Sequence, residues 1–297
     1  MAKIGLIDVD SHNFPNLPLM KIAAYHREQG NSVEFVVPLC EYDRVYVSKI
    51  FDFTPDYNAP ILADEISYGG TGYGLSLSNR LSESIEYIYP AYDIYPQFDA
   101  AYGFLSRGCP RGCPYCIVSS KEGIRSHQVA DLDSFWRGQK EIKLLDPNLL
   151  ACKDREKLLE QLIASNAWID FTQGLDIRSM TKDIADLLMR CKIKRIHFAW
   201  DSERFSELIL KKLEEFKNHT NIPYQKATVY VLVNYDTDFS FDLERVYTLK
   251  NLGYNPYIMI YDKQNAPQNV RHLQRWVNNR IIFRSCERFE DYNPKLA

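Results

Sequence analysis

An alternation of short apolar runs with amphipathic stretches, from about residue 101 onward, constrains the fold more than any other feature of the sequence. Apolar stripes at helical spacing, such as Leu158, Leu159 and Leu162, separate the runs. Strands that alternate with helices form a parallel sheet with the helices outside it. We therefore expect an α/β fold whose larger part is a curved parallel sheet. The predicted strands are residues 102–105, 142–145, 169–171, 196–200, 229–233 and 257–261.

The N-terminal part of the chain predicts a smaller unit of the same class. A strand over residues 3–8, a helix over 17–29 and a strand over 32–37 form a strand-helix-strand unit of Rossmann type. Residues 46–53 and 65–68 are candidates for two further strands.

We therefore divide the chain into three parts. A small Rossmann-like domain spans residues 1–78, a tyrosine-rich linker spans 79–100 and packs over the larger domain, and that larger domain spans 101–297. Its C-terminal extension is expected to hold a helix over 269–279 and a short closing strand over 281–283.

Composition and charge exclude several classes of protein. The start of the chain has no apolar run long enough for a signal peptide or a membrane span, so we expect a cytoplasmic protein without membrane attachment. A net charge of −3 predicts no nucleic-acid surface. The densest basic cluster, at residues 192–195, is expected in a solvated loop between a helix and a strand.

Three cysteines stand close together in a loop rich in glycine and proline. Cys109, Cys113 and Cys116 have the spacing C-x3-C-x2-C, and in the cytoplasm such thiols are reduced or bind metal. A structural zinc site needs four protein ligands, and no fourth is evident nearby. A 4Fe-4S cluster held by three cysteines keeps one iron open for an outside ligand. A zinc knuckle, or three unrelated buried cysteines, are the alternatives.

This loop resembles the signature of the radical S-adenosylmethionine (SAM) enzymes, C-x3-C-x-aromatic-C, and Tyr115 occupies the aromatic position. The resemblance extends over residues 101 to about 265 and implies a partial (βα)6 barrel of the radical SAM type. It also implies a 4Fe-4S cluster, SAM bound to the open iron, and an electron donor such as flavodoxin or ferredoxin. The expected activity is reductive cleavage of SAM to a 5′-deoxyadenosyl radical, which abstracts hydrogen from an unknown substrate.

Polar residues follow the predicted strands, where parallel barrels place their functional groups. The resemblance implies that the end of the second strand contacts the methionine amino group of SAM. Arg178 is the candidate for the methionine carboxylate, because a guanidinium binds a carboxylate through two hydrogen bonds. For each side chain taken alone, a helix cap or a surface polar group is the alternative. The full set of expected SAM contacts is Asp146 and Asn148 (amino group), Arg178 (carboxylate), Gln173 and Ser202 (ribose), and Tyr115 and the backbone near Ile260 (adenine).

The N-terminal unit resembles the cobalamin-binding-like domain that precedes the barrel in one branch of the same family. Asp10, His12 and Pro15 are similar to a D-x-H-x-x-G motif for axial histidine ligation, but a proline replaces the glycine. We therefore expect no cobalamin ligation by His12, although a corrinoid is possible. A cobalamin-dependent radical methyltransferase and a non-catalytic iron-sulfur or zinc protein are the competing functions.

Overall fold

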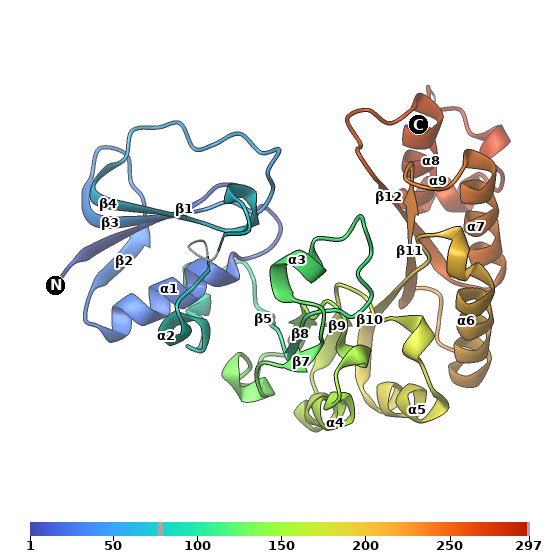
Figure 1. Ribbon diagram of the computed structural model, residues 1–297, viewed down its shortest axis with the longest axis horizontal. Helices are drawn as coiled ribbons and strands as arrows, with labels where there is room; N and C mark the ends of the chain where they lie inside the picture. Colours follow the sequence, from blue (N-terminus) through green and yellow to red (C-terminus); the bar gives the residue numbers. More distant parts are fainter. Residues whose placement is uncertain (77–79, 296–297) are drawn as a thin grey trace.

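The protein has two units, each built on a parallel sheet, in a computed structural model that describes residues 1–76 and 80–295 (Figure 1). The smaller sheet has the strand order β2-β1-β3-β4, and the larger has the order β12-β11-β10-β9-β8-β5. These parallel sheets confirm the predicted α/β class. The predicted domain boundary at residues 78 and 79 lies outside the described residues.

The N-terminal unit contains the predicted strand-helix-strand unit. Asn16 starts helix α1 by accepting a hydrogen bond from the backbone N–H of Leu19 (3.2 Å). The helix packs Leu19 and Ile22 against Leu6 on one face of the sheet. In the described part of the chain, loops without α-helices join β2 to β3 and β3 to β4. The elements are β1 (Lys3–Asp8), α1 (Leu17–Glu28), β2 (Ser32–Phe35), β3 (Glu41–Ser48) and β4 (Leu62–Gly69).

The segment between the two sheets is short of regular structure, as predicted for a linker. Its described part holds α2 (Glu83–Glu86) and the 3-10 turns Thr71–Tyr73 and Tyr92–Ile94. The Tyr92 hydroxyl accepts a hydrogen bond from the Tyr102 N–H (3.0 Å), and the Tyr95 hydroxyl donates one to Asp8 (2.6 Å). The linker is therefore fixed between β1 and β5.

All six predicted strands of the larger unit are confirmed. Each pairs in parallel with the next one along the chain, so sequence order and spatial order are the same. The strands β6 (Ser106–Arg107) and β7 (His127–Gln128) form a separate antiparallel pair around the cysteine loop. The sheet strands are β5 (Ala101–Gly103), β8 (Glu141–Leu144), β9 (Trp168–Phe171), β10 (Lys192–Ala199), β11 (Ala227–Val233) and β12 (Asn255–Ile260).

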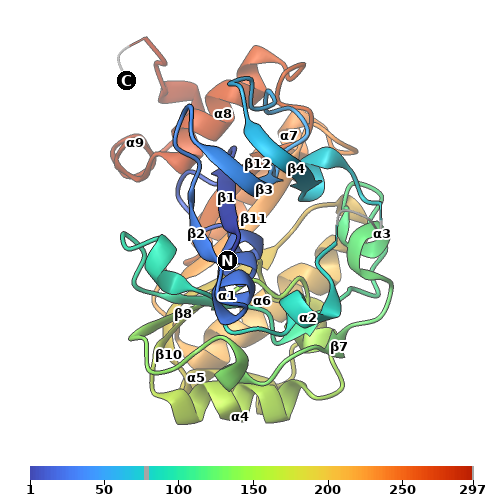
Figure 2. The same ribbon diagram turned by 90° about the vertical axis from the view of Figure 1, so that its left-hand side faces the viewer.

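Helices cover one face of this larger sheet, as Figures 1 and 2 show. Phe171, Phe198 and Val231 point into this helical layer and belong to the main hydrophobic core. Among the described residues, none of the helices is both long and apolar enough to span a membrane. The helices are α3 (Val118–Glu122), α4 (Arg155–Ser165), α5 (Lys182–Arg190), α6 (Ser206–Thr220), α7 (Phe239–Asn251), α8 (Gln268–Asn278) and α9 (Arg280–Ser285).

Two local predictions were wrong. The expected closing strand at residues 281–283 is helical and belongs to α9. Asn279 caps this helix by accepting hydrogen bonds from the N–H groups of Ile281 (3.1 Å) and Ile282 (3.2 Å). Only Phe283 of the apolar run is buried, packing on Trp276 (4.9 Å between ring centroids), whereas a strand of this sheet would bury more.

The basic cluster at residues 192–195 begins strand β10 and is not a loop. Its pairing with β9 is irregular between Ile193 and Arg195. This bulge lets Ile193 and Ile196 both reach the buried helical layer, although they are three residues apart. The basic side chains therefore lie along a strand.

Candidate functional site

The cysteine loop follows β5, at the carboxyl end of an edge strand of the larger sheet. Gly108 has a φ of 87°, and a Cβ atom there would stand 2.1 Å from the carbonyl oxygen of Arg125. Only glycine allows this close approach. The neighbouring Cys109 N–H then donates to the Gly123 carbonyl (3.1 Å) and closes the loop.

The three predicted cluster ligands are half-buried, free thiols. Burial raises the pKa of Cys116, and the nearby Cys113 and Cys109 raise it further, so the three sulfur atoms interact electrostatically. Across residues 1–76 and 80–295, no three Cys, His, Asp or Glu side chains converge to hold a single metal ion. A four-iron cluster requires a wider arrangement, because each thiolate binds its own iron.

Asp146 anchors the start of the cysteine loop. Its carboxylate accepts hydrogen bonds from the N–H of Leu105 (3.0 Å), the N–H of Ser106 (2.5 Å) and the Ser106 hydroxyl (2.6 Å). Burial raises its pKa to about 6. The carboxylate expected to contact the SAM amino group is therefore bound to the chain that carries the cysteines.

Asn148 lies against the first cysteine of the motif. Its side-chain N–H donates to the Cys109 sulfur (3.3 Å), and only 2% of the residue is exposed. Its Oδ1 atom is buried and has no hydrogen-bond partner among the described residues. A buried acceptor without a donor costs about 1–3 kcal/mol, so such atoms are rare unless something completes them. This oxygen is the best candidate at the end of β8 to accept from a ligand amino group.

Arg178 is paired with a carboxylate of its own chain. Asp176 accepts from Arg178 Nε (2.8 Å) and also from Arg111 Nε, at the tip of the cysteine loop. Burial alone would raise the pKa of Asp176, but these two guanidinium groups hold it below its usual range. The pair ties the cysteine loop to the loop after β9, and Arg178 keeps further N–H donors for a ligand.

Tyr115 fits between the cysteine loop and the ends of three other strands. Its hydroxyl donates to Asp201 Oδ2 (3.2 Å) just after β10. Its ring makes an edge contact with Tyr235 after β11, which in turn contacts Tyr261 after β12 (5.2 and 4.8 Å between centroids). Burial raises the pKa of both Tyr115 and Asp201, so a protonated phenol is maintained next to the cysteines.

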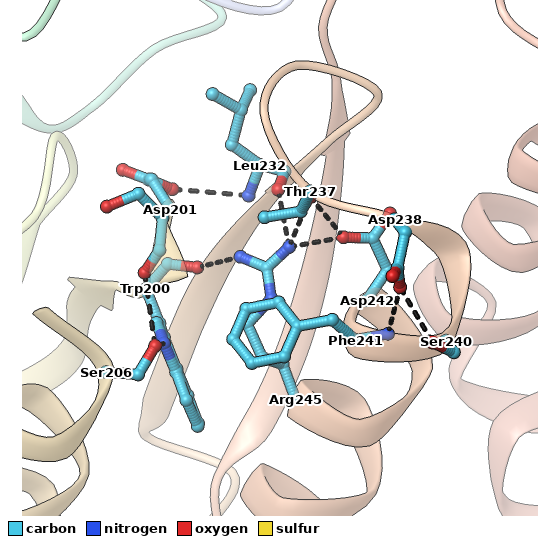
Figure 3. A network of polar contacts seen from close by, with 11 residues as sticks. Trp200, Asp201, Ser206, Leu232, Thr237, Asp238, Ser240, Phe241, Asp242 and Arg245 are labelled. Atoms are coloured by element: carbon cyan, nitrogen blue, oxygen red, sulfur yellow. Dashed lines mark hydrogen bonds and ion pairs between the residues drawn. The ribbon is translucent and has the colours of Figure 1, made fainter. Parts of the chain in front are cut away.

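A buried guanidinium holds the strand ends beneath this contact (Figure 3). Arg245, which is fully buried, donates to the carbonyl oxygens of Trp200 (2.5 Å) and Leu232 (2.9 Å). It also forms an ion pair with Asp242 (2.5 Å). Asp201 accepts from the Leu232 N–H (3.2 Å), so the same strand ends fix the carboxylate that faces Tyr115.

Sequence reasoning missed this network, although one signal was available. Asp242 and Arg245 occupy buried positions of α7 at i, i+3 spacing, next to the apolar Val246 and Leu249. Oppositely charged residues on the apolar face of a helix indicate a buried ion pair or a site.

The other three predicted SAM contacts are at the ends of β9, β10 and β12. Gln173 is exposed after β9, Ser202 is half-buried with its carbonyl accepting from the Ser206 hydroxyl (3.2 Å), and Ile260 is half-buried at the end of β12. Within the described ranges, no hydrogen bond joins these three residues to the cysteine loop.

The carboxyl ends of the larger sheet's strands thus gather three thiols, a guanidinium, a buried phenol–carboxylate pair and a buried amide oxygen that has no donor among the described residues. Thiols of this kind are soft ligands suited to iron-sulfur clusters, and the polar groups are suited to a zwitterionic ligand beside them. Comparison of the chain with models of known protein families gave no match, and comparison with curated proteins gave no significant match.

Proposed function

We propose that the chain is a radical SAM enzyme that holds a 4Fe-4S cluster through Cys109, Cys113 and Cys116. One observation carries the proposal: the C-x3-C-x-Tyr-C loop follows the first strand of a parallel sheet whose strands run in sequential order. Ligands of open parallel sheets bind at the carboxyl ends of the strands. In this proposal the larger sheet is the partial (βα)6 barrel of the family, and the smaller unit is its Rossmann-like companion.

The residues present fit such a cluster. Three thiols on one glycine-supported loop would bind three irons and leave the fourth for an outside ligand. When bound, the cluster supplies one electron that splits SAM into methionine and a 5′-deoxyadenosyl radical.

The chain itself binds and orients SAM. Asn148 Oδ1 is buried and has no donor in the part of the chain that the structure describes, and the Asn148 side chain contacts Cys109, so we assign this oxygen to the methionine amino group. Asp146 contributes indirectly, because it fixes the loop through Leu105 and Ser106. Arg178 binds the methionine carboxylate with the N–H groups that Asp176 leaves free. Tyr115, kept protonated by burial and held by Asp201, forms the wall next to the adenine.

No corrinoid is assigned to the N-terminal unit. His12 is exposed and has a left-handed φ of 39°. In the same loop, the Asp10 carboxylate already accepts hydrogen bonds from the N–H groups of Ile50 (2.7 Å) and Phe51 (2.9 Å). Titration with hydroxocobalamin tests this. A stoichiometric complex whose absorbance changes in His12→Ala would favour the cobalamin-dependent methyltransferase instead.

Anaerobic reconstitution tests the main proposal. Purified protein is incubated with iron and sulfide, its iron, sulfide and zinc contents are measured, and SAM and dithionite are then added. We expect one 4Fe-4S cluster per chain and production of 5′-deoxyadenosine. Bound zinc in place of iron, or a cluster without any cleavage of SAM, would instead identify a non-catalytic metal-binding protein.

A further inference from the structure

The face of the larger sheet that lies opposite its helices carries polar and aromatic side chains, and we call it the open face. Parallel sheets usually bury both faces under helices. Here α4 to α8 lie on one side, and the N-terminal unit lies toward the other (Figure 1). The open face is defined by alternate residues of neighbouring strands: Lys143, Asp170, Arg195, His197, Tyr230 and Tyr257.

The N-terminal unit covers only one end of the open face. Leu17 and Met20 of α1 pack in a cluster with Phe104 and Leu145, next to β5 and β8. At the other end, on β12, Tyr257 and Met259 remain 43% and 46% exposed. Alternate apolar side chains on one strand form a continuous apolar strip, so the uncovered part can contact an apolar or aromatic ligand.

Two cations on the open face, one beside the covered end and one on β10, flank a carboxylate. Lys143 and Arg195 are the register partners of Asp170 on either side of it. In the described part of the chain, neither cation has a carboxylate within ion-pair distance, and the Lys143 ammonium stands over the rings of Phe14 and Tyr102 (5.2 Å each). Glu141, on the same face of β8 as Lys143, is paired with Lys194. Lys143 and Arg195 around Asp170 therefore leave an excess of one positive charge, which attracts an anion although the whole chain has a net charge of −3.

His197, a largely buried residue, presents a hydrogen-bond acceptor on the same face. The residue is only 8% exposed, and its Nδ1 atom is 3.0 Å from the Phe171 carbonyl oxygen. A carbonyl can only accept, so Nδ1 carries the hydrogen. Burial lowers the pKa of His197 and keeps the ring neutral, which leaves Nε2 as an acceptor. Among the described residues Nε2 has no hydrogen-bond partner, and the ring stacks on Tyr230 (5.1 Å, 7°).

We propose that the open face binds the substrate, and that the substrate combines an anionic oxygen group, a hydrogen-bond donor and an apolar or aromatic body. Lys143 and Arg195 bind the anionic group, His197 Nε2 accepts from the donor, and Tyr257 and Met259 contact the body. The ligand is a substrate only under the function proposed above, whereas its binding requires neither cluster nor SAM.

A matched series of small probes tests this on the full chain by calorimetric titration, with and without the reconstituted cluster. The probes are 3-(4-hydroxyphenyl)propionate, its analogue without the hydroxyl, 4-hydroxyphenyl phosphate, and tyramine as the cationic counterpart. We expect saturable binding of the anions and binding of tyramine that is weaker by about tenfold or more. Whichever of the two hydroxylated anions binds more tightly shows whether the anionic group of the substrate is a carboxylate or a phosphate. Equal binding of tyramine, or no saturable binding of any anion, would overturn the proposal without any variant.

Variants then assign the residues. Lys143→Met should weaken the binding of all the anionic probes by about tenfold. Lys211 is an exposed lysine on α6, and Lys211→Met should leave the binding of these probes unchanged. His197→Gln should remove the difference in affinity between the probes with and without the hydroxyl group, and it should leave the affinity of the probe without the hydroxyl unchanged. Equal effects of Lys143→Met and Lys211→Met would refute the assignment. Anion binding is also measured without the cluster, so a failure to cleave SAM would not affect the proposal for the open face. A failure to bind anions would likewise not affect the proposal that the chain cleaves SAM.

Discussion

The polar side chains at the carboxyl ends of the two sheets differ in how completely they are hydrogen-bonded. At the end of the smaller sheet, the Asp10 carboxylate accepts hydrogen bonds from two backbone N–H groups. The Asn16 side-chain N–H donates to the hydroxyls of Ser11 (3.1 Å) and Ser48 (2.9 Å), and the Asn16 side-chain oxygen caps α1. At the end of the larger sheet, the buried Oδ1 of Asn148 has no partner in the described residues. The smaller sheet's polar groups bind one another, whereas the larger sheet leaves an acceptor free.

This difference indicates where a ligand acts. A polar network in which each member has a partner stabilises the native state and needs nothing from outside. An unpaired buried group lowers stability, and it persists where a bound molecule completes it. This comparison supports the proposal that a ligand binds at the larger sheet and that the smaller sheet has a structural role.

The largest expected effect comes from the cysteines. Replacing Cys109, Cys113 or Cys116 by alanine should abolish both the bound iron and the cleavage of SAM, because each thiolate holds one iron. Cys40→Ala, in the N-terminal unit, is the matched control and should retain both. Iron and sulfide content after reconstitution is the measurement. Equal cluster content in the triple alanine variant would remove the cluster from this loop.

The fold was largely predictable from the sequence, for a physical reason. A strand such as residues 227–233 is buried along almost its whole length and is therefore mostly apolar, and the helices that follow carry apolar stripes at their own spacing. The errors occurred where this periodicity is weak. The apolar run 281–283 is too short for its periodicity to distinguish a strand from a helix. The bulge in β10 interrupts the alternation of apolar and polar residues, so the charged start of that strand was interpreted as a loop.

The site was predictable only in part. Spacing alone identifies the three cysteines as candidate ligands, because they stand close together along the chain. The partners of Arg178 and Tyr115 come from distant segments, and the pairing of Arg178 with Asp176 depends on how two loops meet. Sequence spacing carries no information on such contacts, so it did not show that Asp146 also holds the start of the cysteine loop through Ser106.

The next largest effect should be on stability, at the buried ion pair beneath the larger site. Arg245→Met leaves the Asp242 carboxylate buried without its partner and should lower the free energy of unfolding by about 3–5 kcal/mol. At the smaller sheet, Lys49→Met breaks a pair with Asp56, whose side chain is 68% exposed, and should cost far less. Urea unfolding of both variants measures the difference. Equal losses would show that the two strand ends do not differ in this respect.

The pH dependence of stability should show the contribution of Asp146. Burial raises its pKa from 3.8 to about 6, so between these values the folded state holds a proton that the unfolded state has released. Its stabilising effect is therefore complete below pH 3.8 and is lost as the pH rises through about 6. The difference in unfolding free energy between wild type and Asp146→Asn should change by about 3 kcal/mol over this range. A difference independent of pH would contradict the prediction.

The smallest effects, and the sharpest form of the comparison, concern the two asparagines. Asn16→Ala removes a helix cap and leaves Ser11 and Ser48 without a donor, so it should lower stability by about 1–3 kcal/mol and leave SAM binding unchanged. Asn148→Ala removes an oxygen that has no partner in the described chain and one N–H···S contact, so its effect on stability should stay within about 1 kcal/mol. If Asn148 accepts from the SAM amino group, the same variant should weaken SAM binding by about tenfold, as measured by titration of the reconstituted protein. A large loss of stability with unchanged SAM affinity would show that Asn148, like Asn16, serves only the fold.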